Sequence, residues 1–360
     1  MIPTLEGGGA ERQLSYLAPK LVENGWNVHI AVLRRGPNYD RIRKERVEIH
    51  EVSYRGHYDP MIVWELICLI RRLQPDIVQT WLTMMDILGG LAANICRVTW
   101  VLSERCGGKA NSPNIKKYLR RFFGLRWADA VVANSQAGVD YWKSEIQRKN
   151  NVHLIRNGLA MIQIESVHPY PKQALGIKEY QRMVLFAGRM CEQKNVQEFL
   201  KSVSIAAQEH DVMAIICGDG PDIQKLRITA KCLGIQDRVQ FKGYVNELWA
   251  LMKAADVFVS VSLWEGMPNT VMEAMACGCP LIVSDIPEHR EILRENHALF
   301  VNPYDPKDIA NAINQVFENP EEASQRAFRA AHIAKEWTVE KMAEGYDCIY
   351  RELLGESSRR

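Results

Sequence analysis

Short hydrophobic runs alternate with longer segments in which hydrophobic residues recur every three or four positions. Runs rich in Val, Ile and Leu predict buried strands, and the longer segments predict amphipathic helices. Strands are predicted at 28–33, 47–52, 76–80, 98–103, 129–134, 183–188, 212–218, 239–243, 256–260, 280–284 and 298–301. Helices are predicted at 10–24, 61–73, 85–96, 115–126, 136–146, 196–208, 222–233, 247–254, 270–277, 306–318, 321–335 and 339–354. This alternation is typical of α/β proteins with parallel sheets.

The alternation is interrupted between residues 156 and 181, where Asn157-Gly158 and two prolines occur without periodicity. Such a segment is typical of an interdomain linker. The length of 360 residues also fits two domains of roughly 150 residues each. We expect a Rossmann-like amino-terminal domain at 1–165, a second Rossmann-like domain at 166–335, and a terminal helical segment at 336–360 that packs back toward the first domain.

The composition is that of an ordinary globular protein, with 47% hydrophobic and 24% charged residues. No hydrophobic run approaches the roughly 18 residues of a membrane-spanning helix, and no secretory signal is evident. The nine cysteines lack metal-ligand spacing, which argues against a disulfide framework or a structural zinc site. We therefore expect a cytoplasmic enzyme.

Charge is distributed unevenly along the chain. The net charge is +7 over residues 1–165 and −5 over the remainder. Residues 115–127 contain five cations, no acid, and aromatic residues at helical spacing. This segment could lie on an anionic membrane surface, or it could be a core-packing helix with a solvated basic face. No RNA-binding motif accompanies it, so we expect no nucleic-acid partner.

The most informative chemistry lies in residues 262–280, which follow a predicted strand and lead into a helix. Ligands of open α/β sheets bind at the carboxyl ends of strands. Glu265 and Glu273 could both accept hydrogen bonds from sugar hydroxyls there, although Glu273 could also lie on a solvated helix face. Gly266 lets backbone approach a ligand, and the helix amino terminus, capped by Asn269 or Thr270, could hold an anion.

Other predicted strand ends carry further candidates. Gly188 is followed by Arg189 and Lys194, two cations suited to a diphosphate. Residues 218–221 and 241–245 form further junctions, and the glycines at 7–9 open the first helix. Neither the dinucleotide-binding pattern G-x-G-x-x-G nor a phosphate-binding loop of Walker type is present.

In this order the motifs resemble those of the retaining glycosyltransferases of family 4. The resemblance covers E-x7-E from Glu265 to Glu273, G-R-x4-K from Gly188 to Lys194, the amino-terminal glycine loop, and Gly-Asp-Gly-Pro at 218–221. It extends from residue 2 to about residue 354. It implies the GT-B fold, in which two Rossmann-like, doubly wound parallel-sheet domains face each other across a cleft.

The resemblance also implies roles for individual residues. Arg189 and Lys194 would bind the donor diphosphate and, with Glu265, form the catalytic set, while Glu273 would hold the nucleotide ribose. The other implied donor contacts are Gly8 and Gly9 at the β-phosphate, Tyr244 and Val245 at the base, and Gly266, Met267, Pro268 and Asn269 at the donor sugar and phosphate.

The sequence departs from the family pattern at three places, one of them the third-strand segment, where Val78-Gln79-Thr80-Trp81 lacks the usual His. The fourth strand ends in Ser103-Glu104-Arg105 in place of the usual His, so Glu104 and Arg105 would contact donor or acceptor, or would pair with each other. The first strand has only residues 1–4, with Pro3 near its end. We expect apolar residues upstream, or a domain weakened at its centre, or a neighbouring strand that closes part of the gap.

The implied function is retaining transfer of a hexose from a nucleotide-diphosphate sugar, UDP- or GDP-linked, to a lipid-linked or saccharide acceptor. The resemblance places this reaction in cell-surface polysaccharide or glycolipid synthesis, by a cytoplasmic enzyme peripheral on the inner face of the membrane. No Asp-x-Asp motif occurs, so we expect neither a metal nor another cofactor. The alternatives are a nucleotide-sugar 2-epimerase and a non-catalytic sugar-nucleotide-binding subunit.

Overall fold

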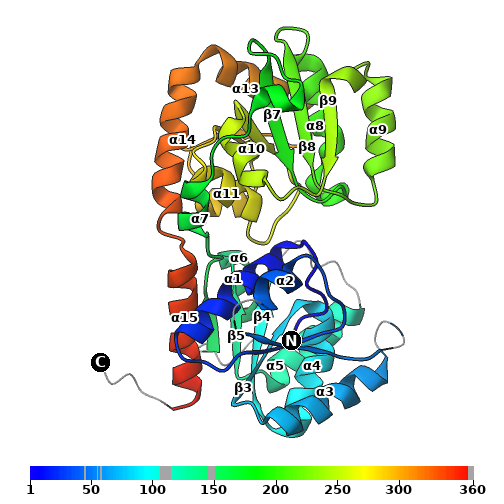
Figure 1. Ribbon diagram of the computed structural model, residues 1–360, viewed down its shortest axis with the longest axis vertical. Helices are drawn as coiled ribbons and strands as arrows, with labels where there is room; N and C mark the ends of the chain where they lie inside the picture. Colours follow the sequence, from blue (N-terminus) through cyan, green and yellow to red (C-terminus); the bar gives the residue numbers. More distant parts are fainter. Residues whose placement is uncertain (44–45, 55, 57–58, 106–114, 145–150, 356–360) are drawn as a thin grey trace. The chain divides into compact units, whose positions relative to one another are not determined.

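Buried strands alternate with amphipathic helices in the computed structural model, which describes residues 1–43, 46–54, 56, 59–105, 115–144 and 151–355. Cys106 and the end of the helix predicted at 136–146 lie outside these residues. The chain divides into two units (Figure 1). Met1–Gly158 and Trp337–Arg360 form the amino-terminal unit, and Leu159–Glu336 form the carboxyl-terminal unit. The chain thus leaves the first unit at Gly158 and returns to it with its last helix.

The carboxyl-terminal unit is built on one six-stranded sheet in the order β12-β11-β10-β7-β8-β9, and all neighbours are parallel. Its strands are β7 (Arg182–Ala187), β8 (Val212–Cys217), β9 (Val239–Gly243), β10 (Val257–Ser260), β11 (Leu281–Ser284) and β12 (Leu299–Val301). Its helices are α7 (Met161–Ser166), α8 (Val196–Ala206), α9 (Ile223–Cys232), α10 (Leu248–Ala254), α11 (Asn269–Ala276), α12 (Pro287–Ile292), α13 (Pro306–Glu318) and α14 (Pro320–Ala334), with short 3-10 turns η3 (Lys172–Leu175), η4 (Glu192–Lys194) and η5 (Gln236–Arg238).

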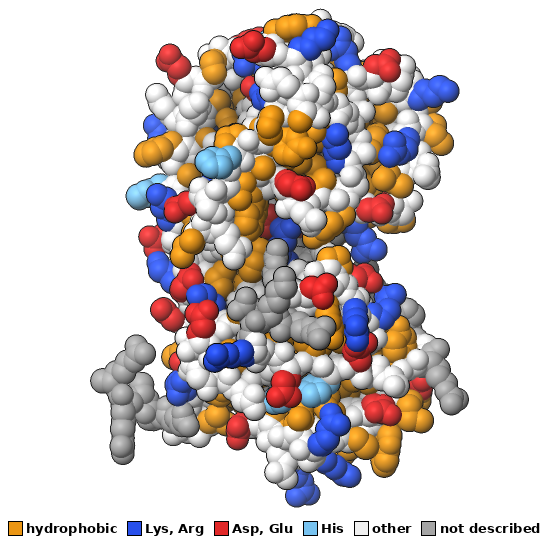
Figure 2. Space-filling model, viewed as in Figure 1, with side chains coloured by type: hydrophobic (Ala, Val, Ile, Leu, Met, Phe, Trp, Pro, Cys, Tyr) orange, Lys and Arg blue, Asp and Glu red, His pale blue; other side chains and the backbone are white. Residues whose placement is uncertain are grey.

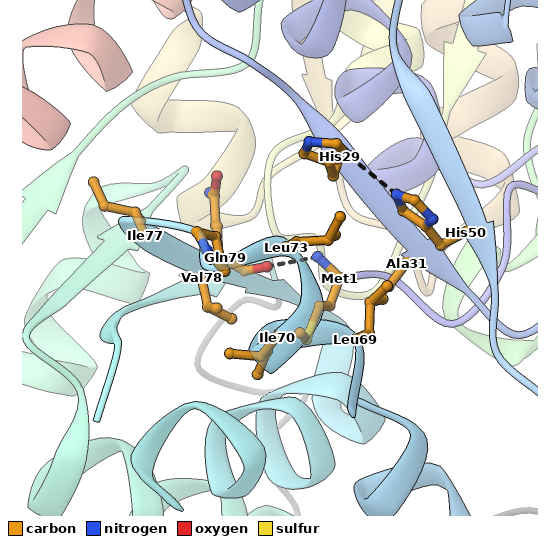
Figure 3. A pocket seen from close by; sticks show the side chains of 11 residues that line it. Met1, His29, Ala31, His50, Leu69, Ile70, Leu73, Ile77, Val78 and Gln79 are labelled. Carbon is orange, nitrogen blue, oxygen red and sulfur yellow. Dashed lines mark hydrogen bonds between the residues drawn. The ribbon is translucent and has the colours of Figure 1, made fainter. Parts of the chain in front are cut away.

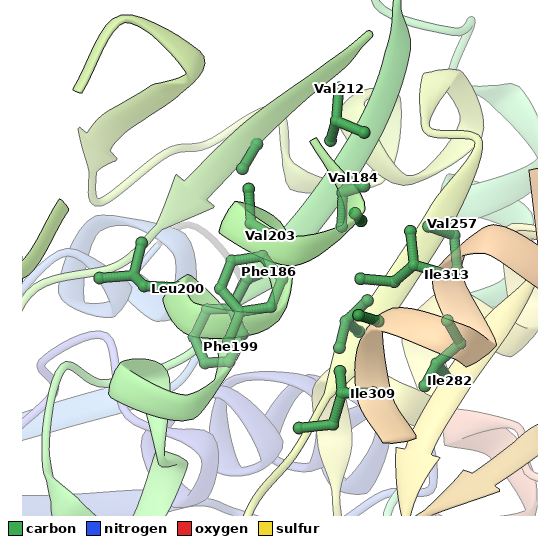
Figure 4. Close-up of a cluster of buried hydrophobic side chains, with 14 of the residues drawn as sticks. Val184, Phe186, Phe199, Leu200, Val203, Val212, Val257, Ile282, Ile309 and Ile313 are labelled. Carbon is green, nitrogen blue, oxygen red and sulfur yellow. The ribbon is translucent and has the colours of Figure 1, made fainter. Parts of the chain in front are cut away.

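The core of this unit fills the space between the sheet and helices α8 and α13 (Figure 4). Phe186 of β7 packs against Phe199 of α8 with ring centroids 5.2 Å apart. Ile309 and Ile313 lie one turn apart on α13 and are fully buried. Burial of each such side chain stabilises the fold by about 1.5–3 kcal/mol relative to leaving it exposed. This layer therefore holds the strands, and with them the loops that follow the strand ends, in place.

The amino-terminal unit has two parallel sheets, a two-stranded β1-β2 and a four-stranded β3-β4-β5-β6. Its strands are β1 (His29–Val32), β2 (Glu48–Glu51), β3 (Ile77–Trp81), β4 (Thr99–Glu104), β5 (Ala130–Ala133) and β6 (Val152–Leu154). Its helices are α1 (Gly9–Glu23), α2 (Asn38–Arg43), α3 (Pro60–Leu73), α4 (Leu82–Cys96), α5 (Ile115–Trp127), α6 (Gln136–Lys143) and α15 (Val339–Leu353).

Residues 1–5 lie between β1 and β3 and join the two sheets. Toward β1, the Ile2 amide donates to the carbonyl of Ala31 at 3.0 Å, and the carbonyl of Pro3 accepts from Leu33 at 3.0 Å. Toward β3, the nitrogen of Met1 donates to the carbonyl of Gln79 at 2.6 Å. Pro3 is tolerated because its carbonyl, rather than the missing N–H, makes the bond to β1.

Residues 1–5 fill the position between β1 and β3 only beside the carboxyl ends of these two strands. Beside Met1 lies a cavity of about 70 Å³, lined on one side by His29 and His50 and on the other by Ile77 and Gln79 (Figure 3). A short segment therefore bonds to both neighbouring strands, while part of the gap stays open.

Helix α15 completes the amino-terminal unit. Trp26 donates its indole N–H to Asp347 at 2.7 Å, and the Tyr350 hydroxyl hydrogen-bonds to the side chain of Gln79. These contacts tie the last helix to the segment after α1 and to β3. In the described part of the chain, no helix combines the length and the apolar character needed to cross a membrane.

Cationic and acidic side chains are mixed on the face of each unit that Figure 2 shows. The charge difference between the two halves of the sequence therefore does not form one continuous basic face in this view.

Candidate functional site

The candidate site lies at the carboxyl edge of the six-stranded sheet, where the loops after β7 and β8 touch. The Met190 amide donates to the carbonyl of Asp219 at 2.9 Å. A Cβ on Gly218 would lie 2.0 Å from the carbonyl oxygen of Gly188, and one on Gly220 would lie 2.3 Å from that of Met190. Glycine is therefore required at both positions for the two loops to meet.

Lys194 and Glu265 form the centre of the site. The ammonium of Lys194, at the end of η4, lies 2.5 Å from a carboxylate oxygen of Glu265, in the loop after β10. Burial acts to raise the pKa of Glu265, but Lys194, together with Ser262 and His289, outweighs it and holds that pKa below its usual range. The stem of Lys194 packs on Gly188, where a Cβ would lie 3.4 Å from its Cδ. The sequence motif G-R-x4-K thus delivers a positioned ammonium to a buried carboxylate.

The two loops that carry this pair are fastened to each other by Gln193. Its side-chain amide donates to the carbonyl of Trp264 at 2.8 Å, and its own carbonyl accepts from the Leu263 amide at 2.9 Å. The position of Glu265 relative to Lys194 is therefore set by backbone contacts rather than by the ion pair alone.

Glu273 lies on α11 with 2% of its surface exposed, so the alternative of a solvated helix face is wrong. Pro268 is the N-cap of α11, and no side chain caps the helix, so the predicted cap by Asn269 or Thr270 is also wrong. The first turn of α11 follows directly after Glu265. An uncapped helix amino terminus at a strand end is a natural anion site.

Arg189, Tyr244 and Val245 lie along the same sheet edge. Arg189 follows β7 and is exposed, and among the described residues its guanidinium has no ion-pair partner. Tyr244 and Val245 follow β9, and the Tyr244 side chain is 50% exposed. The structure thus brings Lys194 and Glu265 into contact, and leaves Arg189 and Tyr244 open at the same edge.

His289, which sequence reasoning missed, is buried in this region. It lies on α12, fully buried, with Nδ1 2.9 Å from the carbonyl oxygen of Ser284. Burial lowers its pKa although nearby Glu265 opposes this, so the imidazole is neutral. Within the described chain its Nε2 has no hydrogen-bond partner. A single His on a six-residue helix carries no motif, so the sequence offered no signal for it.

Gly8 and Gly9 belong to the amino-terminal unit, at the start of α1. Gly8 is the N-cap and no side chain caps this helix. A Cβ on Gly8 would lie 2.3 Å from a carboxylate oxygen of Glu11. The loop is exposed and follows the segment paired with the carboxyl end of β1, the edge at which ligands of such sheets bind.

Glu104 has structural partners inside the amino-terminal unit. It is fully buried and accepts hydrogen bonds from Arg120 at 2.7 Å and Trp142 at 2.9 Å. Arg120 also donates to Asp86 at 2.6 Å. One guanidinium is therefore shared by two buried carboxylates.

Arg105 is likewise engaged within its unit. Its guanidinium donates to Asn157 at 2.8 Å and to Tyr346 at 2.5 Å, and it stacks over Trp81 with its central carbon 3.8 Å from the ring centroid. The predicted Glu104–Arg105 pairing is not what holds these groups, because each has its hydrogen bonds with other residues. The Ser-Glu-Arg motif connects β4 to α5 and α15.

Helix α5 agrees only in part with the prediction of a core-packing helix with a solvated basic face. Ile115, Tyr118 and Phe122 are 75%, 71% and 52% exposed, whereas Arg120 is only 6% exposed. Phe123 and Trp127 do pack on the core, so the core-packing prediction is confirmed in that respect, but the solvent face is apolar as well as basic. An apolar stripe faces outward, and one of the five cations lies in the core.

Both halves of the chain match known family models. Residues 7–161 match the model described as Glycosyltransferase Family 4, and residues 171–332 match the one described as Glycosyl transferases group 1. The chain is 25% identical to LpsE, a lipopolysaccharide core biosynthesis glycosyltransferase of Rhizobium meliloti, over 86% of this chain and 85% of that protein.

Two further similarities concern a second relative and a solved structure. The UDP-Gal:alpha-D-GlcNAc-diphosphoundecaprenol alpha-1,3-galactosyltransferase of Escherichia coli is 27% identical over 66% of this chain and 63% of its own length. The crystal structure of Anabaena HepE in complex with UDP and glucose has a TM-score of 0.84 at 20% identity, over 99% of both chains. The GT-B fold is therefore confirmed.

Proposed function

The chain is a family 4-like glycosyltransferase, and we propose that it is a retaining hexosyltransferase that uses a nucleotide-diphosphate sugar. The observation that carries this proposal is the Lys194–Glu265 pair beside the uncapped start of α11. It combines a positioned cation, a helix start that no side chain caps and a buried carboxylate at the edge where α/β sheets bind ligands.

In this proposal the donor diphosphate binds to Lys194, Arg189 and the first turn of α11. Lys194 supplies a point charge, and the exposed Arg189 supplies a planar fork that suits phosphate oxygens. Glu265 and Glu273 would accept hydrogen bonds from hydroxyls of the donor sugar and the ribose. Tyr244 and Val245 would lie against the base, and Gly8 and Gly9 would approach the β-phosphate.

We propose front-face transfer for the chemical step. The acceptor oxygen attacks the anomeric carbon as its bond to the diphosphate breaks, and the departing diphosphate takes the acceptor proton. The cations Lys194 and Arg189 stabilise the charge that develops on the leaving group, so that no metal ion is needed there. Full activity in EDTA is the expected result. Activity that disappears in EDTA and returns with Mg²⁺ or Mn²⁺ contradicts this.

For the substrates, we propose a UDP- or GDP-linked hexose and a lipid-linked or saccharide acceptor in cell-surface polysaccharide or glycolipid synthesis. The names of the E. coli and Rhizobium relatives, which include a diphosphoundecaprenol acceptor and lipopolysaccharide core synthesis, support this class. The exposed apolar stripe of α5, flanked by cations, supports a peripheral position on an anionic membrane. The similar proteins are glycosyltransferases, which gives the epimerase alternative no support.

The deciding experiment measures the binding of UDP and GDP by calorimetry, followed by turnover of the matching hexose donors with and without a lipid-linked acceptor. We expect transfer that depends on the acceptor, with the anomeric configuration retained in the product by NMR. Donor binding without turnover would indicate a non-catalytic subunit. Inversion of the anomeric centre would overturn the retaining assignment.

A further inference from the structure

A second cluster of ligating side chains lies on one face of the two-stranded sheet in the amino-terminal unit. β1 and β2 pair in parallel with His29 opposite Glu48 and Ala31 opposite His50. Alternate residues of a strand face the same side, so His29, Glu48 and His50 share a face. Figure 3 shows the two imidazoles side by side above the cavity, joined by a dashed line.

The three ligating atoms form a compact triangle. His29 Nδ1 lies 3.0 Å from His50 Nε2 and 3.3 Å from a carboxylate oxygen of Glu48, and His50 Nε2 lies 3.9 Å from the same oxygen. Ligand atoms about 2.0–2.1 Å from a tetrahedral zinc ion lie roughly 3.4 Å from one another. The triangle therefore has the size of one face of a zinc coordination tetrahedron.

Burial also fits a bound ion that keeps access to solvent. The side chains of His29 and His50 are 20% and 18% exposed, and that of Glu48 is 65% exposed. The adjacent cavity of about 70 Å³ leaves room for a water molecule as the fourth ligand. The imidazoles are thus held in place by packing, while Glu48 can close onto the ion from the solvent side.

We propose that His29, Glu48 and His50 form a binding site for a divalent transition-metal ion of the zinc class. Two imidazole nitrogens and one carboxylate oxygen suit Zn²⁺, Co²⁺, Ni²⁺ or Cu²⁺, whereas Mg²⁺ and Ca²⁺ prefer sites made only of oxygen. The bound ion fastens β1 to β2. Its role is to stabilise the sheet, because none of the three residues belongs to the donor site.

The position of the cluster separates it from the reaction. His29 is the first residue of β1, and the glycine loop follows the segment paired with the opposite, carboxyl end of that strand. A structural ion here is compatible with transfer that needs no metal at the diphosphate. It also predicts that metal removal lowers stability and leaves donor binding unchanged.

The test titrates the full-length protein, stripped with EDTA and dialysed, with ZnCl₂ by calorimetry and by thermal unfolding, and with CoCl₂ by visible absorption. We expect a zinc-dependent rise in Tm of roughly 5–10 °C at zinc concentrations about 100-fold above Kd. We also expect the absorption bands of four-coordinate Co²⁺.

The decisive variant is His50→Gln, whose amide can still hydrogen-bond to His29. Since losing an outer-shell partner already costs about 10–100-fold in metal affinity, losing a ligand should cost at least that much. The second variant is Glu48→Gln. The Glu48 side chain is exposed, so this variant should fold normally, and it should also bind Zn²⁺ more weakly. If either variant binds Zn²⁺ as tightly as the parent protein, the site is wrong.

The matched control is His210→Gln. His210 belongs to another close group, with Glu209 and Glu318, but that group offers a single imidazole among exposed acids. We expect its replacement to leave the Tm shift and the Co²⁺ spectrum unchanged. If His210→Gln abolishes them instead, the ion binds in the carboxyl-terminal unit and the proposal is overturned.

Discussion

Buried charge is arranged differently in the two units. In the carboxyl-terminal unit, Lys194 and Glu265 pair one to one at the ligand edge of a continuous sheet. In the amino-terminal unit, Arg120 lies between Asp86 and Glu104, and it holds helix α5 to the interior. The same kinds of side chain thus serve a candidate site in one unit and the packing of a helix in the other. A buried ion pair does not by itself mark a ligand site.

The two arrangements move carboxyl pKa values in opposite directions. Burial raises the pKa of Asp86 to about 6 although Arg120 and Thr80 act to lower it, and the charge of Glu104 adds to the rise. Burial acts in the same sense on Glu265, but there the dedicated Lys194 prevails and the pKa is lowered. The balance between burial and the neighbouring cation therefore differs between these two carboxyls, with burial prevailing at Asp86 and the charged and polar neighbours prevailing at Glu265.

Replacing Arg120 by Met should have the largest effect, because it removes the only cation of the buried network described for the amino-terminal unit. The change leaves two buried carboxylates without their cation, which typically costs about 3–5 kcal/mol. We expect faster amide hydrogen exchange in β3, β4 and β5, and unchanged exchange in β7, β8 and β10. The exposed Arg126→Met is the matched control, within about 0.5 kcal/mol of the parent. Equal loss of protection in both units would show that the network is not local.

Asp86→Asn sharpens the comparison by giving the amino-terminal unit a one-to-one pair. The folded pKa of Asp86, about 6, exceeds its usual value of 3.8, so the folded state binds the proton more tightly. Protonation of Asp86 therefore stabilises the folded state fully below pH ~4. This stabilisation, at most about 3 kcal/mol, is lost as the pH rises through about 6. Denaturant unfolding between pH 4 and 7 should show this fall in the parent protein and a flatter profile in Asp86→Asn. Parallel profiles would refute the assignment.

Lys194→Ala tests the other pair. We expect binding of the donor diphosphate to weaken by about 1.5–3 kcal/mol, because a charged hydrogen-bond donor is lost. Without Lys194, the pKa of Glu265 should also rise, since the main contribution that opposes burial is then lost. Calorimetry with UDP and GDP measures the first effect. Lys201→Ala, which removes a helix-surface pair with Glu198, should bind like the parent. Equal affinity of all three proteins would exclude Lys194 from phosphate binding.

The smallest expected effect concerns the outward face of α5. Phe122→Ser removes an exposed aromatic residue and should lower binding to anionic vesicles several-fold, about 1 kcal/mol, with little change in stability. Co-sedimentation with anionic and neutral vesicles is the measurement. The control is Phe328→Ser, on an exposed position of α14 in the other unit. Identical loss in both variants would mean that α5 is not the contacting surface.

Most helices could be predicted because their hydrophobic residues recur on one face, and most strands because they are continuous runs of Val, Ile and Leu. The exceptions are short elements such as β6 at Val152–Leu154 and α12 at Pro287–Ile292, which contain too few residues to establish a period. The start of α11 was predicted to within one residue, but its cap was not, because Pro268 is the N-cap and no side chain caps the helix.

Lys194 and Glu265 could be predicted because each lies in a motif that a single loop carries, the first after β7 and the second after β10. Arg120 could not be distinguished from its neighbouring cations in sequence, because its burial depends on Asp86 and Glu104, which other segments supply. His29 and His50 meet only because β1 and β2 are adjacent and in register. Such contacts arise from strand pairing and have no local signature.

The return of the chain to the amino-terminal unit has a consequence for biosynthesis. Tyr346 and Tyr350 of α15 supply partners for Arg105 and Gln79, yet they leave the ribosome only after the whole carboxyl-terminal unit has been made. At about 5–20 residues per second, that interval lasts on the order of ten seconds or more. During it the nascent amino-terminal unit lacks its last helix and exposes the apolar surface that α15 later covers. The carboxyl-terminal unit is one uninterrupted stretch and needs no later segment, so the half that is synthesised first is the half that is completed last.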